Sequence, residues 1–160
     1  MIEMTIKGFV VDPFTETPIV ILKDKDGDHV LPIWVGQCEA NAISRLIENV
    51  VTPRPMTHDL LRNIITDLDG RVDRIVVSDL KENTFYAIVH LTVRGERVAV
   101  DARPSDAIAL ALRTRAPIMV EESVIENAKT VDFGSERLNQ EKVQQWLEAL
   151  DPTELPKYKM

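Results

Sequence analysis

Four consecutive residues, Arg103-Pro104-Ser105-Asp106, place a cation, a hydroxyl and a carboxylate directly before an apolar stretch. A proline at the first helical position, followed by a hydroxyl and an acid, is an ordinary helix start and complements the helix dipole. Capping does not require Arg103, because a cation opposes the positive end of a helix unless an anion neutralises it. An arginine beside free backbone amides is therefore a candidate contact for phosphate.

A second stretch, from Arg54 to Asp59, has the same order of arginine, proline, hydroxyl and acid. Thr57 as a helix cap, with Asp59 in the first turn, accounts for most of this pattern. The cap does not need His58, which lies between them. Imidazole exchanges protons near neutral pH, so His58 is the best candidate for a general acid or base among the three histidines.

Three further features each have a structural and a chemical interpretation. Glu121 and Glu122 begin a short predicted helix, where acids are favourable, but paired carboxylates also suit Mg²⁺ or Mn²⁺. Cys38 stands at a helix start, where a thiolate is stabilised, but the sequence identifies no catalytic partner for it. Residues 94–115 hold five arginines and three acids, which indicates either a solvated rim or a groove for a polyanion.

The elements that must position these residues follow from the hydrophobic pattern. Apolar alternation and turn residues predict strands, and the 3.6-residue period predicts helices. The expected strands are 2–11, 18–23, 29–35, 72–80, 84–93, 96–102 and 117–120, and the expected helices begin near 36, 57, 105, 121 and 138. The order strand, strand, strand, helix occurs twice, so we expect a duplicated βββα unit.

The helix that follows Arg103 constrains the fold class. Residues 107–112 carry no polar side chain, so this helix must be covered on all sides. A doubly wound nucleotide-binding sheet would require a glycine-rich turn that the sequence lacks. We therefore expect an α+β fold in which duplicated βββα units form a layered β/α/β arrangement, with extra helices after each unit.

Length and composition exclude several classes of protein. A chain of 160 residues can bury one ordinary core, and a single cysteine excludes an internal disulfide. No basic leader or long apolar run is present, so we expect a soluble cytoplasmic protein without a membrane partner. The net charge of −7 means that affinity for nucleic acid must come from a local cluster of basic residues.

Three stretches taken in order, LPIWVGQCEANAI, RPMTHDLL and DARPSDAIALALRTRAPIMVEE, resemble the bifunctional nuclease domain family of bacteria and plants. The resemblance covers residues 1–128 and leaves 129–160 as a C-terminal helical extension. It implies a duplicated βββα fold in three layers, a homodimer, and cleavage of both DNA and RNA.

On this resemblance, the first hypothesis is a nuclease that hydrolyses phosphodiester bonds with the help of a divalent cation, Mg²⁺ or Mn²⁺. The candidate catalytic residues are Glu39, His58, Asp59 and Asp106; the phosphate-binding candidates are Arg54, Arg103 and Ser105; and the metal ligands are Asp106, Glu121 and Glu122. The alternative is a non-enzymatic dimeric module, regulatory or binding, that recognises an anionic small molecule or a protein partner. A third interpretation is that these motifs only cap helices and build the dimer.

Overall fold

The structure is a computed structural model that describes residues 1–27, 29–128, 131–132, 145 and 148. Eight strands and four helices are described, in the order β1 (Ile2–Val11), β2 (Pro18–Asp24), β3 (His29–Trp34), α1 (Gln37–Ile47), α2 (Thr57–Asp67), β4 (Gly70–Lys81), β5 (Thr84–Val93), β6 (Glu96–Ala102), α3 (Pro104–Thr114), β7 (Ile118–Val120), α4 (Glu122–Asn127) and β8 (Val131–Asp132). The α+β class expected from the sequence is confirmed, with extra helices α2 and α4 after the two βββα stretches.

The eight strands form one sheet in the order β6-β5-β4-β7-β1-β2-β3-β8. Strands β1 to β3 and strands β4 to β6 each form an antiparallel meander, because short connections favour pairing of neighbours. Strand β7 joins the two meanders, parallel to β4 and antiparallel to β1. The described strands are thus one continuous sheet rather than separate sheets. The order βββα occurs twice, while the duplication of the unit stays a prediction.

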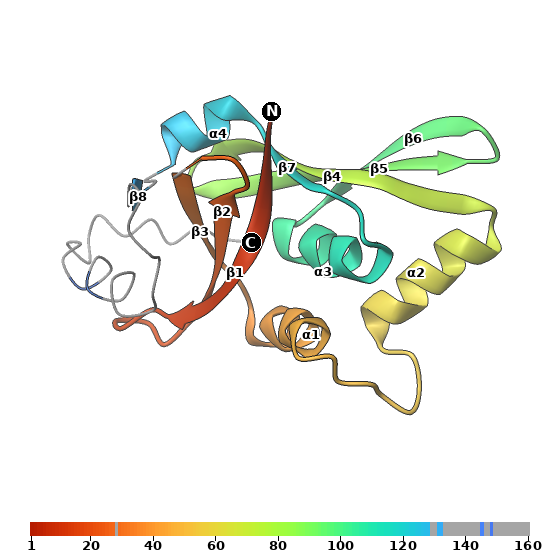
Figure 1. The fold of residues 1–160 in the computed structure, drawn as a ribbon, viewed down its shortest axis with the longest axis horizontal. Coiled ribbons are helices and arrows are strands. Elements are labelled where there is room, and N and C mark those ends of the chain that lie inside the picture. Colours follow the sequence, from red (N-terminus) through yellow and green to blue (C-terminus); the bar gives the residue numbers. More distant parts are fainter. Residues whose placement is uncertain (28, 129–130, 133–144, 146–147, 149–160) are drawn as a thin grey trace.

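Helix α3 lies at the centre of the molecule, against β4 and β5 on one side and against α1 and α2 on the other (Figure 1). Its residues from Ala107 to Ala111 are at most 2% exposed, as the absence of polar side chains predicts. The sequence predicted sheets on both sides of this helix. In the structure the sheet covers one side, and α1 and α2 cover the other. Helix α4 contacts β4.

Burial of aliphatic side chains fixes α1 and α3 relative to the sheet. The fully buried residues include Ile19, Leu31, Ile43, Ile75 and Ile108, which come from β2, β3, α1, β4 and α3. Each such side chain contributes about 1.5–3 kcal/mol by leaving water. The core therefore holds α1 and α3, whereas α2 buries only His58 and packs against the core through the partly buried Ile65.

Two predictions about the ends of the chain have separate outcomes. The predicted helix at 138–150 lies outside the described residues, apart from positions 145 and 148, and the division at residue 128 stays a prediction. Among the described residues, no helix combines the length and the apolar composition that a membrane crossing requires.

Candidate active site

The first turns of three helices meet through a chain of four polar side chains. Arg103, the residue before α3, donates from Nη2 to Glu39 Oε1 of α1 at 2.8 Å and from Nε to Asp106 Oδ2 at 2.9 Å. Asp106 Oδ1 lies 2.9 Å from Nε2 of His58 in α2. We name this set the Glu39–Arg103–Asp106–His58 chain. The structure thus brings together three catalytic candidates and one phosphate-binding candidate.

The carboxylate of Asp106 is held in its charged form. Burial raises the pKa of Asp106, but hydrogen bonds from Arg103 and His58 outweigh this effect and hold the pKa below its ordinary value of 3.8. The same contact with Asp106, followed by that with Glu39, raises the pKa of Arg103. Helix capping did not explain Arg103, which needs an anion to neutralise it at a helix start. In the structure Arg103 faces two carboxylates of its own chain.

The position of Asp106 also sets the tautomer of His58. An ionised carboxylate only accepts hydrogen bonds, so Nε2 of His58 is protonated and its N–H donates a hydrogen bond to Asp106. In the neutral ring, Nδ1 then has the free lone pair and makes no hydrogen bond with a described residue. The His58 side chain is 11% exposed and that of Asp106 is 32% exposed. An aspartate that orients a histidine in this way is one arrangement in which a histidine can act as a general base.

Asp59 and Arg113 form a second ion pair, which joins the same three helices as the Glu39–Arg103–Asp106–His58 chain. Nε of Arg113 donates to Asp59 Oδ1 at 2.8 Å, and the two terminal nitrogens donate to the carbonyl oxygens of Ala109 and Ala42. The Arg113 side chain is only 1% exposed. Because Asp59 belongs to α2 and Ala42 to α1, this one guanidinium connects all three helices. Asp59 therefore holds the first turn of α2 in place, next to His58.

Sequence reasoning did not identify Arg113 as part of the site and counted it only in the charge of residues 94–115. The sequence feature that could have identified Arg113 is its position in a helix that must be covered on all sides, because a buried cation requires a partner. The prediction that Thr57 is the cap of its helix was wrong. Helix α2 begins at Thr57 with Met56 as the cap residue, and Asp59 Oδ2 accepts the Met56 amide hydrogen at 3.0 Å.

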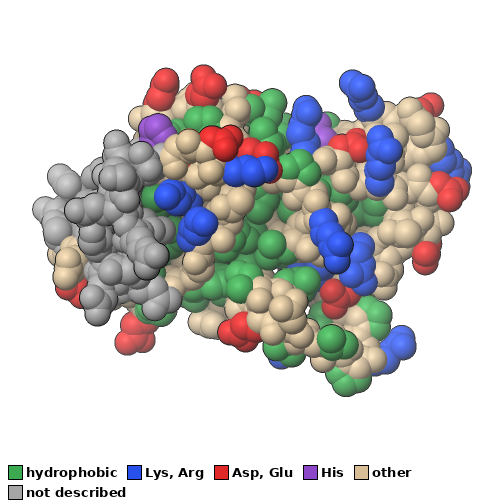
Figure 2. Space-filling view, viewed as in Figure 1, with side chains coloured by type: hydrophobic (Ala, Val, Ile, Leu, Met, Phe, Trp, Pro, Cys, Tyr) green, Lys and Arg blue, Asp and Glu red, His purple; other side chains and the backbone are tan. Residues whose placement is uncertain are grey.

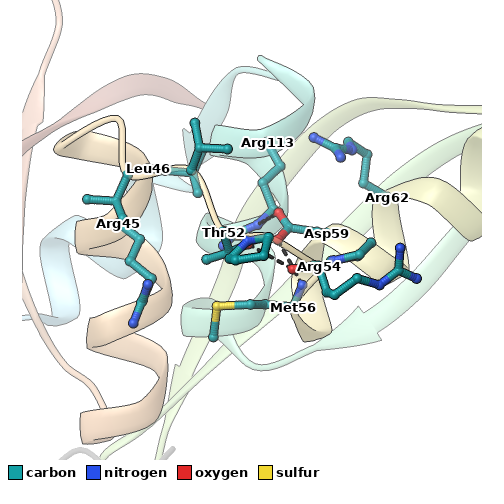
Figure 3. Close-up of a pocket in the computed structure, with 12 residues that line it drawn as sticks. Arg45, Leu46, Thr52, Arg54, Met56, Asp59, Arg62 and Arg113 are labelled. Carbon is teal, nitrogen blue, oxygen red and sulfur yellow. Dashed lines mark hydrogen bonds and ion pairs between the residues drawn. The ribbon is translucent and has the colours of Figure 1, made fainter.

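A cavity of about 320 Å³ lies between the end of α1, the 48–56 connection and the start of α2 (Figure 3). Arg45, Arg54, Arg62 and Arg113 line it, and Asp59 is the one acid in the lining. Neither Arg45 nor Arg54 forms an ion pair with a described residue. The lining consists of Arg45, Leu46, Val50, Val51, Thr52, Pro53, Arg54, Pro55, Met56, Asp59, Arg62 and Arg113. The cavity therefore has an excess of positive charge that suits an anion.

The predicted metal ligands are not brought together. Asp106 uses one oxygen for His58 and the other for Arg103. Glu122 pairs with the N-terminal ammonium group of Met1 at 3.2 Å, and Glu121 is the cap residue of α4. Among the described residues, no three His, Cys, Asp or Glu side chains form a group that could hold a metal ion. These residues therefore do not fit the predicted cation site.

Three other candidate residues, Ser105, Cys38 and Arg54, lie apart from the Glu39–Arg103–Asp106–His58 chain or lack contacts that would suit the predicted chemistry. Ser105 is fully buried, and its hydroxyl has no hydrogen-bond partner in the described structure, so burial does not favour a contact between this side chain and phosphate. Cys38 is exposed in the first turn of α1, and no described side chain makes a hydrogen bond to its sulfur. Arg54 lines the cavity rather than joining the Glu39–Arg103–Asp106–His58 chain.

Acid should destabilise the protein through Asp59. Burial raises the pKa of this carboxyl, but the Met56 amide and Arg113 outweigh it, so the pKa of Asp59 is lowered from 3.8. A group whose pKa is lower in the folded state contributes stability above its unfolded pKa and loses it as the pH falls. We expect the free energy of unfolding to fall less steeply below about pH 4 in Asp59→Asn than in the wild type, measured by urea unfolding. Asp67→Asn, an exposed change at the end of the same helix, should keep the wild-type slope.

Comparison with known proteins gives a consistent family assignment. A family model described as the bifunctional nuclease domain matches residues 20–132. An uncharacterized protein of Mycobacterium tuberculosis is 41% identical over 126 residues, which are 79% of this chain and 75% of that protein. Proteins named bifunctional nuclease 1 are 27% identical over 68% of this chain in rice (Oryza sativa subsp. japonica) and 29% identical over 71% of it in Arabidopsis thaliana. The match covers only 34% and 36% of those two plant proteins.

Proposed function

This chain belongs to the bifunctional nuclease domain family, and on that basis we propose that it hydrolyses phosphodiester bonds in nucleic acid. The plant relatives that are named bifunctional nucleases support the reaction class. The observation that carries the proposal in this chain is the 2.9 Å contact between His58 and Asp106, at the junction of three helix starts. This contact orients the proposed base next to Arg103, whose guanidinium can donate hydrogen bonds to an anion.

His58 is the proton acceptor in the proposed reaction. Water attacks phosphorus as Nδ1 of His58 takes its proton, and the carboxylate of Asp106 stabilises the imidazolium that results. The bond between phosphorus and the leaving oxygen breaks, and solvent protonates the departing alkoxide. The imidazolium then returns its proton to solvent. Asp106 itself stays ionised throughout, because Arg103 donates to its second oxygen.

Arg103 is the proposed contact for the phosphate group. Its Nε and Nη2 donate to Asp106 and Glu39, whereas Nη1 makes no hydrogen bond with a described residue. A guanidinium has five N–H donors, so donors remain for a phosphate oxygen. The side chain is 47% exposed, which leaves it accessible from solvent. Glu39 and Asp106 fix the guanidinium plane, and the helix starts add partial positive charge.

A requirement for Mg²⁺ or Mn²⁺ stays a prediction that this mechanism does not use. A divalent cation would supply Lewis-acid polarisation of the phosphoryl oxygen. The oxygens of Asp106 are already engaged by cationic or hydrogen-bond-donating groups, and Glu122 pairs with the N-terminal amine. No step is therefore assigned to a cation.

Cleavage by the purified wild type tests the proposed activity. End-labelled single-stranded DNA, duplex DNA and RNA should each be incubated with the protein, with added Mg²⁺ or Mn²⁺ and with EDTA. Asp106→Asn, purified in parallel, reports any contaminating nuclease. Faster cleavage by the wild type is the expected result. No cleavage by a folded wild type would exclude the activity, and equal cleavage by both proteins would exclude the assigned site.

The arginine-lined cavity supports a second candidate function, recognition of an anionic small molecule. Its unpaired arginines, Arg45 and Arg54, are the specific observation that favours it. We expect phosphate or a nucleoside monophosphate to raise the melting temperature of the wild type but not of Arg45→Gln with Arg54→Gln. Lys7→Gln with Lys23→Gln, which removes the same charge elsewhere, should respond as the wild type does. Stabilisation without turnover of any nucleic acid would favour this function over the nuclease.

We also propose that the protein is a homodimer. Three apolar side chains of α2 and that of its C-cap residue are 41–54% exposed and follow helical spacing along one stripe: Leu60, Leu61, Ile64 and Leu68. The edge strand β6 is also exposed at Val98 and Val100, and exposed edges and apolar stripes favour association.

Replacing two residues of this stripe should separate the subunits. We expect Leu60→Glu with Ile64→Glu to elute at the monomer mass in size-exclusion chromatography with light scattering, because two charges cannot be buried at the contact without partners. Thr66→Glu with Thr57→Glu, at exposed positions of the same helix, should keep the dimer mass. A monomeric wild type would contradict the proposal.

A further inference from the structure

We infer that the outer face of the β4–β5–β6 meander, opposite α3, binds the phosphate backbone of a nucleic acid. This inference rests on the proposed function and adds a substrate-binding surface outside the active site. The surface consists of Arg71, Arg74, Arg94 and Arg97 and is named here the outer arginine face. None of these residues belongs to the Glu39–Arg103–Asp106–His58 chain.

Strand register places Arg71, Arg74 and Arg97 on one face of the sheet, and Arg94 lies in the turn between β5 and β6. Arg71 pairs with Thr92, which pairs with Arg97, and Arg74 pairs with His90, which pairs with Ala99. Directly opposed residues in antiparallel strands project to the same side. His90 and Thr92 are two residues apart, so both rows project to one side of β5. The side opposite them carries buried Ala87 and Val89 toward α3.

A β-bulge completes this arrangement. Arg71 and Arg74 are three residues apart and would project to opposite sides of a regular strand. The register of β4 shifts between Val72 and Arg74, and the extra residue returns Arg74 to the side of Arg71. The bulge thus converts two arginines that would be separated by the sheet into neighbours on one surface.

The outer arginine face is open, hollowed and positively charged. Two adjoining hollows of about 320 and 570 Å³ share Arg71, Thr92 and Arg97 in their linings. Together they contain four arginines and two acids, Asp69 and Asp73. Basic side chains gather over this end of the molecule in Figure 2, although the whole chain has a net charge of −7.

Two of the four arginines are free for a ligand. Arg71 pairs with Asp73 at 2.8 Å, and Arg94 lies 3.9 Å from Asp69. Arg74 and Arg97 form no ion pair with any described residue. Asp73 also accepts a hydrogen bond from Thr92 at 2.6 Å, which keeps this acid between the strands. Hydrogen bonds from Thr92 and Arg71 lower the pKa of Asp73 most. Arg97 also contributes to lowering the pKa of Asp73, so this acid offsets part of its charge. With four arginines and two acids, the face keeps an excess of positive charge that a polyanion would neutralise.

An extended polyanion matches this surface better than a small anion does. Arg71 and Arg74 lie on β4, Arg97 lies on β6, and Arg94 lies in the turn between β5 and β6. Strands β4 and β6 are separated by β5, with about 4.8 Å between neighbouring strands, and the two rows are about 7 Å apart, so no single phosphate can contact all four arginines. A nucleic acid presents regularly spaced phosphates and gains affinity by releasing its counterions to several arginines at once. The polar residues between them, His90 and Thr92, suit hydrogen bonds to the backbone rather than insertion into a membrane.

The test is salt-dependent binding of a fluorescent single-stranded oligonucleotide, measured by anisotropy in EDTA. All proteins carry His58→Gln, so that cleavage cannot alter the probe. Adding Arg74→Gln and Arg97→Gln should weaken binding about tenfold at low salt and reduce the slope of log affinity against log salt by about 1.4, for two lost contacts. Lys7→Gln with Lys23→Gln removes the same net charge from the other half of the sheet and should leave affinity and slope unchanged.

The outcomes separate this inference from the proposed activity. Equal binding by the arginine variant and the lysine control, or an absence of oligonucleotide binding, would overturn the proposal that the outer arginine face binds nucleic acid. Binding to anionic phospholipid vesicles in place of the oligonucleotide would also overturn it. Selective loss of oligonucleotide binding in the arginine variant supports the inference, whether or not the wild type cleaves nucleic acid. Absence of cleavage bears only on the proposed activity.

Discussion

Replacing Asp106 by asparagine should lower kcat for nucleic acid cleavage by about 10²–10⁴-fold. The amide has no charge to stabilise the imidazolium of His58, and its NH₂ group can hold the ring in the wrong tautomer. Arg103 also loses an anionic partner, so its guanidinium is less well fixed beside the phosphate. Initial rates at saturating substrate measure the effect, and circular dichroism checks that the variant is folded.

Two comparisons make this prediction specific. Asp101→Asn removes an exposed acid from β6, five residues before Asp106, and should retain wild-type activity. Asp106→Asn combined with His58→Gln should be no slower than His58→Gln alone, because residues that act as a unit are not additive. Multiplicative losses would show that Asp106 and His58 act independently, against the proposed mechanism.

Replacing Arg113 by methionine should destabilise the fold by about 3 kcal/mol. Methionine fills much of the same volume, but the Asp59 carboxylate and two carbonyl oxygens of the helical layer lose their donor. For a chain of this size, such a loss corresponds to a decrease of about 6–12 °C in Tm. Urea unfolding at neutral pH and thermal unfolding provide independent measurements.

Arg115→Met is the matched control for Arg113→Met. Arg115 is exposed, lies two residues later and forms no ion pair with a described residue, so its loss should change stability by less than about 0.5 kcal/mol. Arg113→Lys should recover part of the loss, because lysine keeps the charge but cannot reach three acceptors in one plane. Equal stability of the two methionine variants would show that the buried guanidinium does not hold the helices together.

The elements of the fold follow from the sequence because their signals are local. Alternation predicted β5 at 84–93 and β6 at 96–102 with the bounds that the structure shows. The absence of polar residues in 107–112 predicted the burial of α3. The single sheet could not be predicted from the sequence. It depends on the short strand β7, and nothing in the three residues of β7 indicates that they pair with both β1 and β4.

The candidate site was predicted only as separate residues. Glu39, His58, Arg103 and Asp106 were each chosen for their chemistry at helix starts. Their pairing depends on how three helices pack, since His58 and Asp106 are 48 residues apart and Glu39 and Arg103 are 64 apart. The same reasoning placed Glu121 and Glu122 near Asp106 because of sequence proximity. The turn into β7 and α4 instead lets Glu122 pair with the N-terminus.

The ratio of initial cleavage rates for wild type and His58→Gln is the most direct test of the proposed site. Both proteins should act on the same labelled single-stranded DNA, with His29→Gln, an exposed change, as the control for loss of a histidine. We expect the wild type and His29→Gln to cleave at equal rates and His58→Gln to be slower by at least about 100-fold. A folded His58→Gln that cleaves as fast as the wild type would contradict the assignment of His58 as the catalytic base.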